Sequence, residues 1–267
     1  MAHLCVMTLA TRSEKLEAFG RLLDIMDDLR EKCPWDRKQT FESLRLLSIE
    51  EVYELADALL QGDRNGIAEE VGDVMLHMVF YALLGQEEGK FDIASIIHAE
   101  CEKLISRHPH IYGDVVVADE AEVKQNWEKL KLKEKGKKSV LGGVPRGLPA
   151  LVKAYRMQEK TAQFGFEWEH VEEVLTKVEE ELDELKEAFQ EKQGQARIEE
   201  EFGDLLFALV NYGRFLKVDP ETALERTNQK FKRRFEHIEA NAPKPLSEMT
   251  LVEMDELWED AKRLERH

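Results

Sequence analysis

Residues 180–212, EELDELKEAFQEKQGQARIEEEFGDLLFALVNY, carry the clearest helical pattern of this chain. Apolar residues recur every three or four positions on both sides of the short EKQGQ segment, which predicts two amphipathic helices joined by a turn. The same periodicity, rich in Leu, Glu, Lys and Ala, runs through nearly the whole sequence. The best β-like run, DVVVAD at 114–119, is isolated between charged residues. The sequence therefore predicts an all-α fold.

Turn signals divide the rest of the sequence into further helices. We predict helices at about 13–32, 40–60, 66–86, 91–107, 119–135, 149–162, 170–191, 195–216, 219–240 and 247–265. A segment rich in Gly, Pro and Lys, KEKGKKSVLGGVPRGLP, interrupts the helical pattern. We therefore expect an N-terminal helical domain at 13–135, a linker at 136–148 and a C-terminal helical domain at 149–267.

The two halves of the sequence resemble each other at a constant offset of 130 or 131 residues. The aligned segments are EEVYEL (50–55) with EELDEL (180–185), EEVGDVMLHMVFY (69–81) with EEFGDLLFALVNY (200–212), and Trp127-x-x-x-Lys131 with Trp258-x-x-x-Lys262. Similarity at a fixed period is the signature of a duplicated structural unit. The fold class that we expect is a tandem pair of helical-bundle domains.

Each half contains two pairs of carboxylates at helical spacing. Glu181 and Glu184 share one face of the first helix in the second half, and Glu201 and Asp204 share one face of the next helix. The turn makes these helices antiparallel neighbours, so the two pairs can meet across one seam. The matching residues of the first half are Glu51, Glu54, Glu70 and Asp73.

Four carboxylates that meet at the interface of two helices, called the carboxylate seam below, predict a metal site. Four like charges this close are unfavourable unless a cation lies between them, and oxygen ligands suit Mg²⁺ or Mn²⁺ better than zinc. In a chain with 55 acidic residues, one such motif is usually a solvated helix face. Its recurrence in both halves, beside apolar residues such as Leu182 and Phe202, favours the metal site.

Basic and aromatic residues recur on the later helices. Lys230 and Arg234 lie four positions apart and can present two cations on one face, as phosphate binding requires. Trp258 and Lys262 add an aromatic ring and a further cation, and an exposed Trp can stack on a base. A solvated helix face and a helix-packing Trp remain open as alternatives for these residues.

Composition excludes several classes of function. The net charge of −17 repels nucleic acid and anionic lipid, so any anionic ligand must arrive with cations. No apolar run approaches the roughly 18 residues of a membrane span. Residues 1–11 lack the basic region and cleavage site of a signal peptide. Three unclustered cysteines, Cys5, Cys33 and Cys101, fit a reducing cytoplasm and argue against a zinc site.

The motifs together resemble one enzyme family. E-E-x-x-E followed by E-x-x-D, with CPWDRKQTFESLRLLSIEEVYEL and KFKRRFEHIE, is similar to the MazG proteins of the all-α NTP pyrophosphatase superfamily over nearly the whole chain. The resemblance implies a helical bundle completed by homodimerisation. It also implies Mg²⁺-dependent hydrolysis, with Mn²⁺ as an alternative ion, of a broad range of nucleoside triphosphates to monophosphate and pyrophosphate.

The resemblance also assigns roles to individual residues of the second half. The implied metal ligands are Glu181, Glu184, Glu201 and Asp204. The implied substrate-binding residues are Lys177, Glu180, Arg197, Glu200, Lys230, Arg234, Trp258 and Lys262. The implied catalytic residues are Glu180, Glu181, Lys230 and Arg234. Among these, Glu180 could orient or deprotonate the attacking water, and Lys and Arg would stabilise charge on the leaving pyrophosphate.

The halves differ at two of these positions. The first-half counterparts of Lys177 and Arg197 are Leu47 and Gly66, so the first half keeps its carboxylates but lacks two cations. We therefore expect the second half to be the main catalytic domain.

Two other classes compete with this interpretation. A non-catalytic helical dimerisation or regulatory protein would carry the acidic seams only as surface. A di-iron carboxylate protein needs two E-x-x-H motifs on separate helices, and this chain offers one, Glu167 to His170. Within the enzyme class, a relative specialised for dUTP or a phosphoribosyl nucleotide is a further alternative.

Overall fold

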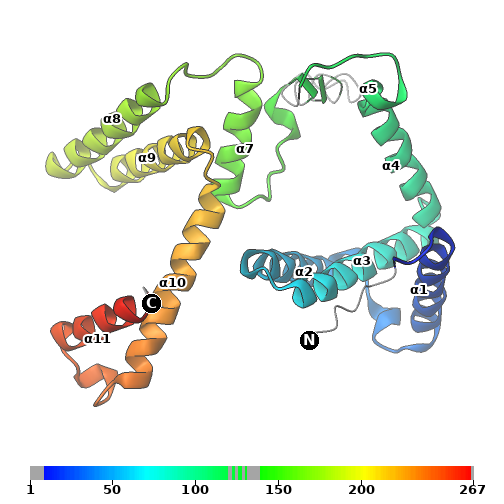
Figure 1. Cartoon of the computed structure of the whole chain (residues 1–267), viewed down its shortest axis with the longest axis horizontal. Helices are drawn as coiled ribbons and strands as arrows, with labels where there is room; N and C mark the ends of the chain where they lie inside the picture. Colours follow the sequence, from blue (N-terminus) through cyan, green and yellow to red (C-terminus); the bar gives the residue numbers. More distant parts are fainter. Residues whose placement is uncertain (1–8, 120–121, 124–125, 128–129, 131–138, 266–267) are drawn as a thin grey trace, which may run out of the picture. The chain divides into compact units, whose positions relative to one another are not determined.

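A computed structural model describes residues 9–119, 122–123, 126–127, 130 and 139–265 of the chain. The chain divides into two compact units, Met1–Ala118 and Asp119–His267, called unit 1 and unit 2 below. The helical elements appear in Figure 1, coloured along the sequence. Among the described residues, no helix combines the length and apolar character needed to cross a membrane.

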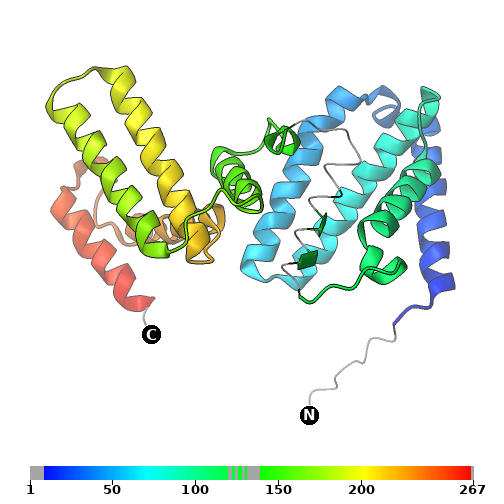
Figure 2. The same ribbon diagram turned by 90° about the horizontal axis from the view of Figure 1, so that it is seen from above.

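Unit 1 is built around a helical hairpin. Its elements are α1 (Arg12–Lys32), the 3₁₀ turn η1 (Asp36–Lys38), α2 (Phe41–Gln61), α3 (Arg64–Glu87), α4 (Ile93–Arg107) and α5 (Pro109–Tyr112). α2 and α3 lie side by side and antiparallel in both views (Figures 1 and 2), and α1 packs against α3. The hairpin turn is short because Gly62 ends α2 with φ of 71°, a left-handed conformation that favours glycine.

Unit 2 repeats this hairpin with different surroundings. Its elements are η2 (Leu141–Gly143), α7 (Ala150–Ala162), α8 (Val171–Gln190), α9 (Gln195–Phe215), α10 (Pro220–Asn241), η3 (Leu246–Glu248) and α11 (Leu251–Leu264). α8 and α9 form the hairpin (Figure 2), α7 packs on α9, and α10 and α11 form a second helical pair. Gly194, with φ of 101°, closes the α8–α9 turn.

The core of unit 1 holds the hairpin against α1. Its buried residues are Met26, Leu44, Val79, Phe80 and Leu84. Phe19, Leu47 and Tyr81 are among the partly buried side chains that pack on them. In unit 2 the buried hairpin residues are smaller, among them Val174, Ala188, Ala208 and Val210. The two hairpins therefore share a backbone arrangement but not a core composition.

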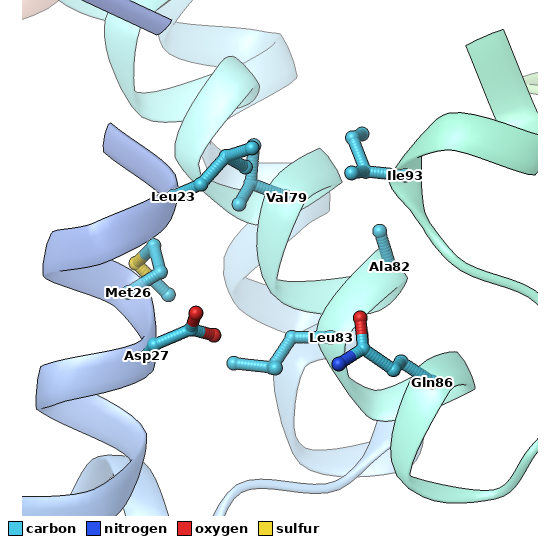
Figure 3. A pocket seen from close by; sticks show the side chains of 8 residues that line it. All are labelled: Leu23, Met26, Asp27, Val79, Ala82, Leu83, Gln86 and Ile93. Atoms are coloured by element: carbon cyan, nitrogen blue, oxygen red, sulfur yellow. The ribbon is translucent and has the colours of Figure 1, made fainter. Parts of the chain in front are cut away.

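A cavity of about 90 Å³ lies in unit 1 between α1, α3 and the start of α4. Its lining residues are Leu23, Met26, Asp27, Val79, Ala82, Leu83, Gln86 and Ile93 (Figure 3). None of the predicted site residues lines it. The chemistry of the chain must therefore be sought at the carboxylates rather than in this cavity.

The predicted all-α fold is confirmed. The described residues contain α-helices and 3₁₀ turns but no strand, and the run at 114–119 is irregular. Part of the predicted helix at 119–135 and part of the predicted linker at 136–148 lie outside the described residues. The predicted domain boundaries stay a prediction.

Candidate metal and nucleotide site

The hairpin of unit 2 brings three predicted metal ligands together. α8 contributes Glu181, and α9 contributes Glu201 and Asp204. One carboxylate oxygen of each lies within 4.8 Å of the other two. Glu181 is 7% exposed and Glu201 is 1% exposed, whereas Asp204 is open to solvent. Buried carboxylates at this separation are stabilised by compensating positive charge or by protonation of one of them.

The fourth predicted ligand, Glu184, lies outside this group of three. It is half-buried one turn along α8 from Glu181. Burial raises the pKa of Glu201, Arg197 opposes that rise, and the negative charge of Glu184 adds to it. Glu184 is therefore close enough to act on the cluster electrostatically.

Two cations of unit 2 contact the clustered carboxylates. Lys177 Nζ lies 2.7 Å from Glu181 Oε1 and 2.9 Å from Glu180 Oε1. These contacts, with Glu181 first, raise the pKa of Lys177. Arg197 pairs in the same way on α9, with Glu201 through Nη2 and with Glu200 through Nη1 at 2.9 Å.

Unit 1 forms a matching cluster. One carboxylate oxygen of each of Glu51, Glu70 and Asp73 lies within 4.8 Å of the other two. Burial raises the pKa of Glu51 and of Glu70, and neighbouring carboxylates, Glu54 among them, raise both further. Glu70 Oε2 is buried and has no hydrogen-bond partner within the described part of the chain. Glu54, like Glu184, is outside the group of three but adds to its negative charge.

Different residues surround the cluster of unit 1. Leu47, the counterpart of Lys177, packs against the apolar core, and Gly66 replaces Arg197. A partly buried polar network joins the two helices that carry the cluster, in which Ser48 Oγ is 2.9 Å from both His77 Nδ1 and Tyr81 Oη. Ser48 also donates to the carbonyl of Leu44 at 2.9 Å. A hydroxyl has one proton, so when Ser48 donates it to the carbonyl of Leu44, His77 and Tyr81 act as the donors to Ser48 Oγ.

Both clusters fit a hard divalent cation. Their donors are carboxylate oxygens, which Mg²⁺ and Mn²⁺ prefer, and neither cluster includes a sulfur or imidazole ligand. The buried, unpaired oxygen of Glu70 is a group that a bound cation would satisfy.

The predicted triphosphate and base residues lie on a different helical pair. Arg234 on α10 donates from Nε and Nη2 to Glu265 Oε2 at 2.8 and 2.6 Å. The guanidinium carbon of Arg234 is 5.4 Å from the ring centroid of Trp258 on α11, and Phe231 lies 5.3 Å from that ring. Lys262 pairs with Glu259 at 2.5 Å.

Within the part of the chain that the structure describes, these contacts of Arg234 and Trp258 involve α10, α11 and the residue that follows α11, and not the carboxylates of α8 and α9. Lys230 is exposed on the same helix as Arg234. Trp258 packs between neighbouring side chains, and its predicted stacking on a base stays a prediction. In the first half, Trp127 is described but Lys131 lies outside the described residues.

Sequence reasoning missed one residue of this region. The hydrogen bonds that Arg234 donates to Glu265 lower the pKa of Glu265, and the positive charges of Arg233 and Lys230 lower it further. Glu265 is 31 residues from Arg234 in sequence. No local spacing rule connects residues that far apart, so only the packing of α10 on α11 reveals the pair.

Comparison with known proteins identifies the family. The MazG nucleotide pyrophosphohydrolase domain matches residues 39–112 and 169–239, which include both hairpins. The nucleoside triphosphate pyrophosphohydrolase/pyrophosphatase MazG of Thermotoga maritima is 47% identical over 251 residues, 91% of this chain and 95% of the relative. The nucleoside triphosphate pyrophosphohydrolase of Escherichia coli K12 is 43% identical over 260 residues, 94% of this chain and 99% of the relative.

A third relative aligns with nearly the whole of this chain over about half of its own length. The uncharacterized protein YabN of Bacillus subtilis is 44% identical over 264 residues, which cover 96% of this chain and 54% of YabN.

The duplicated hairpin with its carboxylate seam defines an all-α protein of the kind that hydrolyses nucleotide anhydrides. The chain belongs to the MazG nucleotide pyrophosphohydrolase family. The resemblance found in the sequence motifs is thereby confirmed, together with the class of enzyme that it implied.

Proposed function

We propose that this chain hydrolyses nucleoside triphosphates to nucleoside monophosphate and pyrophosphate in a reaction that requires Mg²⁺, with Mn²⁺ as an alternative ion. The carboxylate cluster of unit 2 carries the proposal, since it gathers three oxygen ligands at the edge of a helical core. The names of the two full-length relatives describe the same reaction class. A broad range of ribo- and deoxyribonucleotides is the substrate class that we propose.

Each predicted site residue of unit 2 has a proposed role. Glu181, Glu201 and Asp204 hold the cation, and Glu184 adds charge beside it. When bound, Mg²⁺ screens phosphate charge and lowers the pKa of a coordinated water. Glu180, which is adjacent to Glu181 and half exposed, accepts the proton of the attacking water.

The nucleotide is held by the remaining predicted residues. Lys177 and Arg197 lie at the cluster and bind phosphate oxygens, and Glu200 positions Arg197. Lys230, Arg234 and Lys262 bind the triphosphate, and Trp258 contacts the base. Because the net charge of the chain is −17, we propose no nucleic-acid partner. We place the reaction in the cytoplasm, where free thiols such as Cys33 and Cys101 stay reduced.

We also propose that the hairpins complete their bundles in a homodimer. Each hairpin exposes an apolar stripe at equivalent positions, which isolated hairpins cannot bury. The exposed stripe comprises Val52, Leu59, Val71, Met75 and Met78 in unit 1 and Leu182, Phe189, Phe202, Leu206 and Leu209 in unit 2. Light scattering should show a dimer that Phe189→Glu with Leu209→Glu weakens, whereas Val252→Glu, an exposed apolar position on α11, should not change it.

One experiment tests the proposed reaction directly. The purified chain is incubated with each of the eight common nucleoside triphosphates, with Mg²⁺ and with EDTA, and the products are separated. Monophosphate and pyrophosphate should form only with Mg²⁺ and should be lost in Glu201→Gln. The matched control is Glu187→Gln, an exposed carboxylate of α8 outside the cluster.

Two outcomes would contradict the proposal. Diphosphate and phosphate as products would mean that a different bond is cut. No turnover with any nucleotide would favour the non-catalytic regulatory protein.

A further inference from the structure

The cations of unit 2 contact the same carboxylate groups that the metal would need. Lys177 reaches Glu181 at 2.7 Å, and Arg197 pairs with Glu201. Both carboxylates belong to the group whose oxygens converge within 4.8 Å. A divalent cation bound by these carboxylates would compete with both side chains for the same two negatively charged groups.

The members of these ion pairs differ in their freedom to move. The side chains of Glu181 and Glu201 are 9% and 2% exposed, so packing fixes them on the seam. The side chains of Lys177 and Arg197 are 38% and 44% exposed. Long cationic side chains with solvated ends leave a partly exposed ion pair at little cost in free energy. The cations can therefore withdraw while the carboxylates stay in place.

Unit 1 is an internal comparison for this arrangement. Its cluster has the same three carboxylate positions, but Leu47 and Gly66 stand where the cations would be. The cations are therefore not required for the hairpin to bring three carboxylates together. Their presence in unit 2 alone points to a task in the half to which we assign catalysis.

We propose that Lys177 and Arg197 are exchangeable counter-ions, which neutralise the carboxylates of unit 2 before the divalent cation binds and move to the phosphate oxygens of the nucleotide afterwards. The proposal deepens the function proposed for unit 2 and rests on it. One divalent cation replaces the two monovalent side chains of Lys177 and Arg197 at the carboxylates. Both side chains then become available to the phosphate groups of the nucleotide. Metal and nucleotide therefore favour each other's binding at this site.

Mn²⁺ binding without nucleotide tests whether the divalent cation displaces Lys177 and Arg197 from the carboxylates. The parent protein is the full chain with Glu51→Gln, Glu70→Gln and Asp73→Asn, which removes the cluster of unit 1 and keeps that of unit 2. Adding Lys177→Met and Arg197→Met removes the competing cations. Calorimetry or electron paramagnetic resonance should then show Mn²⁺ binding that is tighter by roughly three- to tenfold, as expected for the loss of two partly exposed ion pairs.

A second readout follows thermal unfolding of the same proteins. Removing both cations should lower the unfolding temperature in EDTA, because the carboxylates lose their counter-ions. Saturating Mn²⁺ should then raise the unfolding temperature of this variant by more than that of its parent. The single variants Lys177→Met and Arg197→Met give the same test at smaller amplitude if the combined variant does not fold.

Lys186 offers a matched control on the same helix. It pairs with Asp183 at 2.8 Å, and both side chains are more than half exposed, away from the seam. Lys186→Met should leave Mn²⁺ affinity unchanged. Unchanged or weaker Mn²⁺ binding after removal of Lys177 and Arg197 would overturn the exchange.

Failure of the metal assignment gives a different result. In that case, replacing Glu181, Glu201 and Asp204 by their amides would leave Mn²⁺ binding unaltered. That outcome would overturn the proposed metal site of unit 2 and the exchange with it.

Discussion

The two hairpins of this chain bring the same three carboxylates together but compensate their charge in different ways. In unit 2, Lys177 and Arg197 pair directly with the clustered carboxylates. In unit 1 those positions are Leu47 and Gly66, and no cation among the described residues opposes the rise in the pKa of Glu51 and Glu70, whereas Arg197 opposes the rise in the pKa of Glu201 in unit 2. Sequence duplication has therefore kept the oxygen ligands while their electrostatic environment diverged.

The side chains next to the carboxylates on the hairpin helices also differ between the two units. Unit 1 joins partly buried Ser48 and buried His77 by a hydrogen bond, whereas unit 2 has Val178 and Ala208 at the equivalent positions. Only the tyrosine recurs, as Tyr81 and Tyr212. Unit 1 also has Leu47 and Gly66 at the positions of Lys177 and Arg197, and the expectation that unit 2 is the main catalytic half stays a prediction.

The largest expected effect separates the two clusters by activity. Replacing Glu181, Glu201 and Asp204 by amides should lower kcat by at least about 100-fold, since the cation that screens the phosphates loses its ligands. The equivalent changes at Glu51, Glu70 and Asp73 should retain most of the activity. Pyrophosphate release with Mg²⁺ measures both, and equal losses would contradict the assignment of catalysis to unit 2.

A smaller effect, on stability, concerns position 47, where unit 1 has Leu and unit 2 has Lys177. Leu47→Lys should destabilise the chain by about 1–3 kcal/mol, because Leu47 packs on the core of unit 1 and the substitution removes that apolar contact, a loss that pairing of the new amine with Glu51 would only partly offset. Denaturant unfolding measures the change. The matched substitution Leu46→Lys, at an exposed neighbour, should be nearly neutral. Equal effects would mean that position 47 could have carried a cation without cost.

The buried histidine should give unit 1 its own pH dependence. Burial lowers the pKa of His77 below 6.5, although Asp73 opposes this. The unfolded chain therefore binds a proton that the folded chain does not, and stability should fall as pH drops through about 6.5. The unfolding temperature should decline by a few degrees between neutral and mildly acid pH. His77→Ala, the residue of unit 2, should lose that decline and retain any that arises elsewhere.

The smallest effect concerns carboxylate repulsion in unit 1. The raised pKa of Glu70 means that the folded chain holds this proton more tightly than the unfolded chain. The stability that this provides is present below about 4.5 and is lost as pH rises through the folded pKa. Glu70→Gln should therefore raise the unfolding temperature at neutral pH in EDTA and have little effect in acid. A lower temperature at neutral pH would show that the charged form is favoured in the fold.

Much of this arrangement could be predicted from the sequence because it depends on local spacing. The predicted helix at 170–191 is α8, Val171–Gln190, and the predicted helix at 195–216 is α9, Gln195–Phe215. Helical periodicity placed Glu201 and Asp204 on one face, and the short turn placed Glu181 opposite them. These relations use only neighbours within a turn or a hairpin.

The rest depends on contacts that no local rule supplies. The network of Ser48 and His77 joins residues 29 apart, and the pair of Arg234 and Glu265 joins residues 31 apart. The spacing of Lys177 and Glu181 permits an ion pair, but it could not show that the lysine contacts a ligand rather than a phosphate. The functional roles of the site residues stay predictions.

The ion pairs of unit 2 also bear on the order in which this hairpin forms. Lys177 and Glu181 lie four residues apart on one helix, and so do Arg197 and Glu201. Contacts of such low sequence separation form with the helix itself, before two helices must find each other. The acidic faces of α8 and α9 therefore reach their docking step already partly neutralised. Folding of this hairpin should proceed in a chelator, and metal loading becomes a later event that does not limit the yield of folded protein.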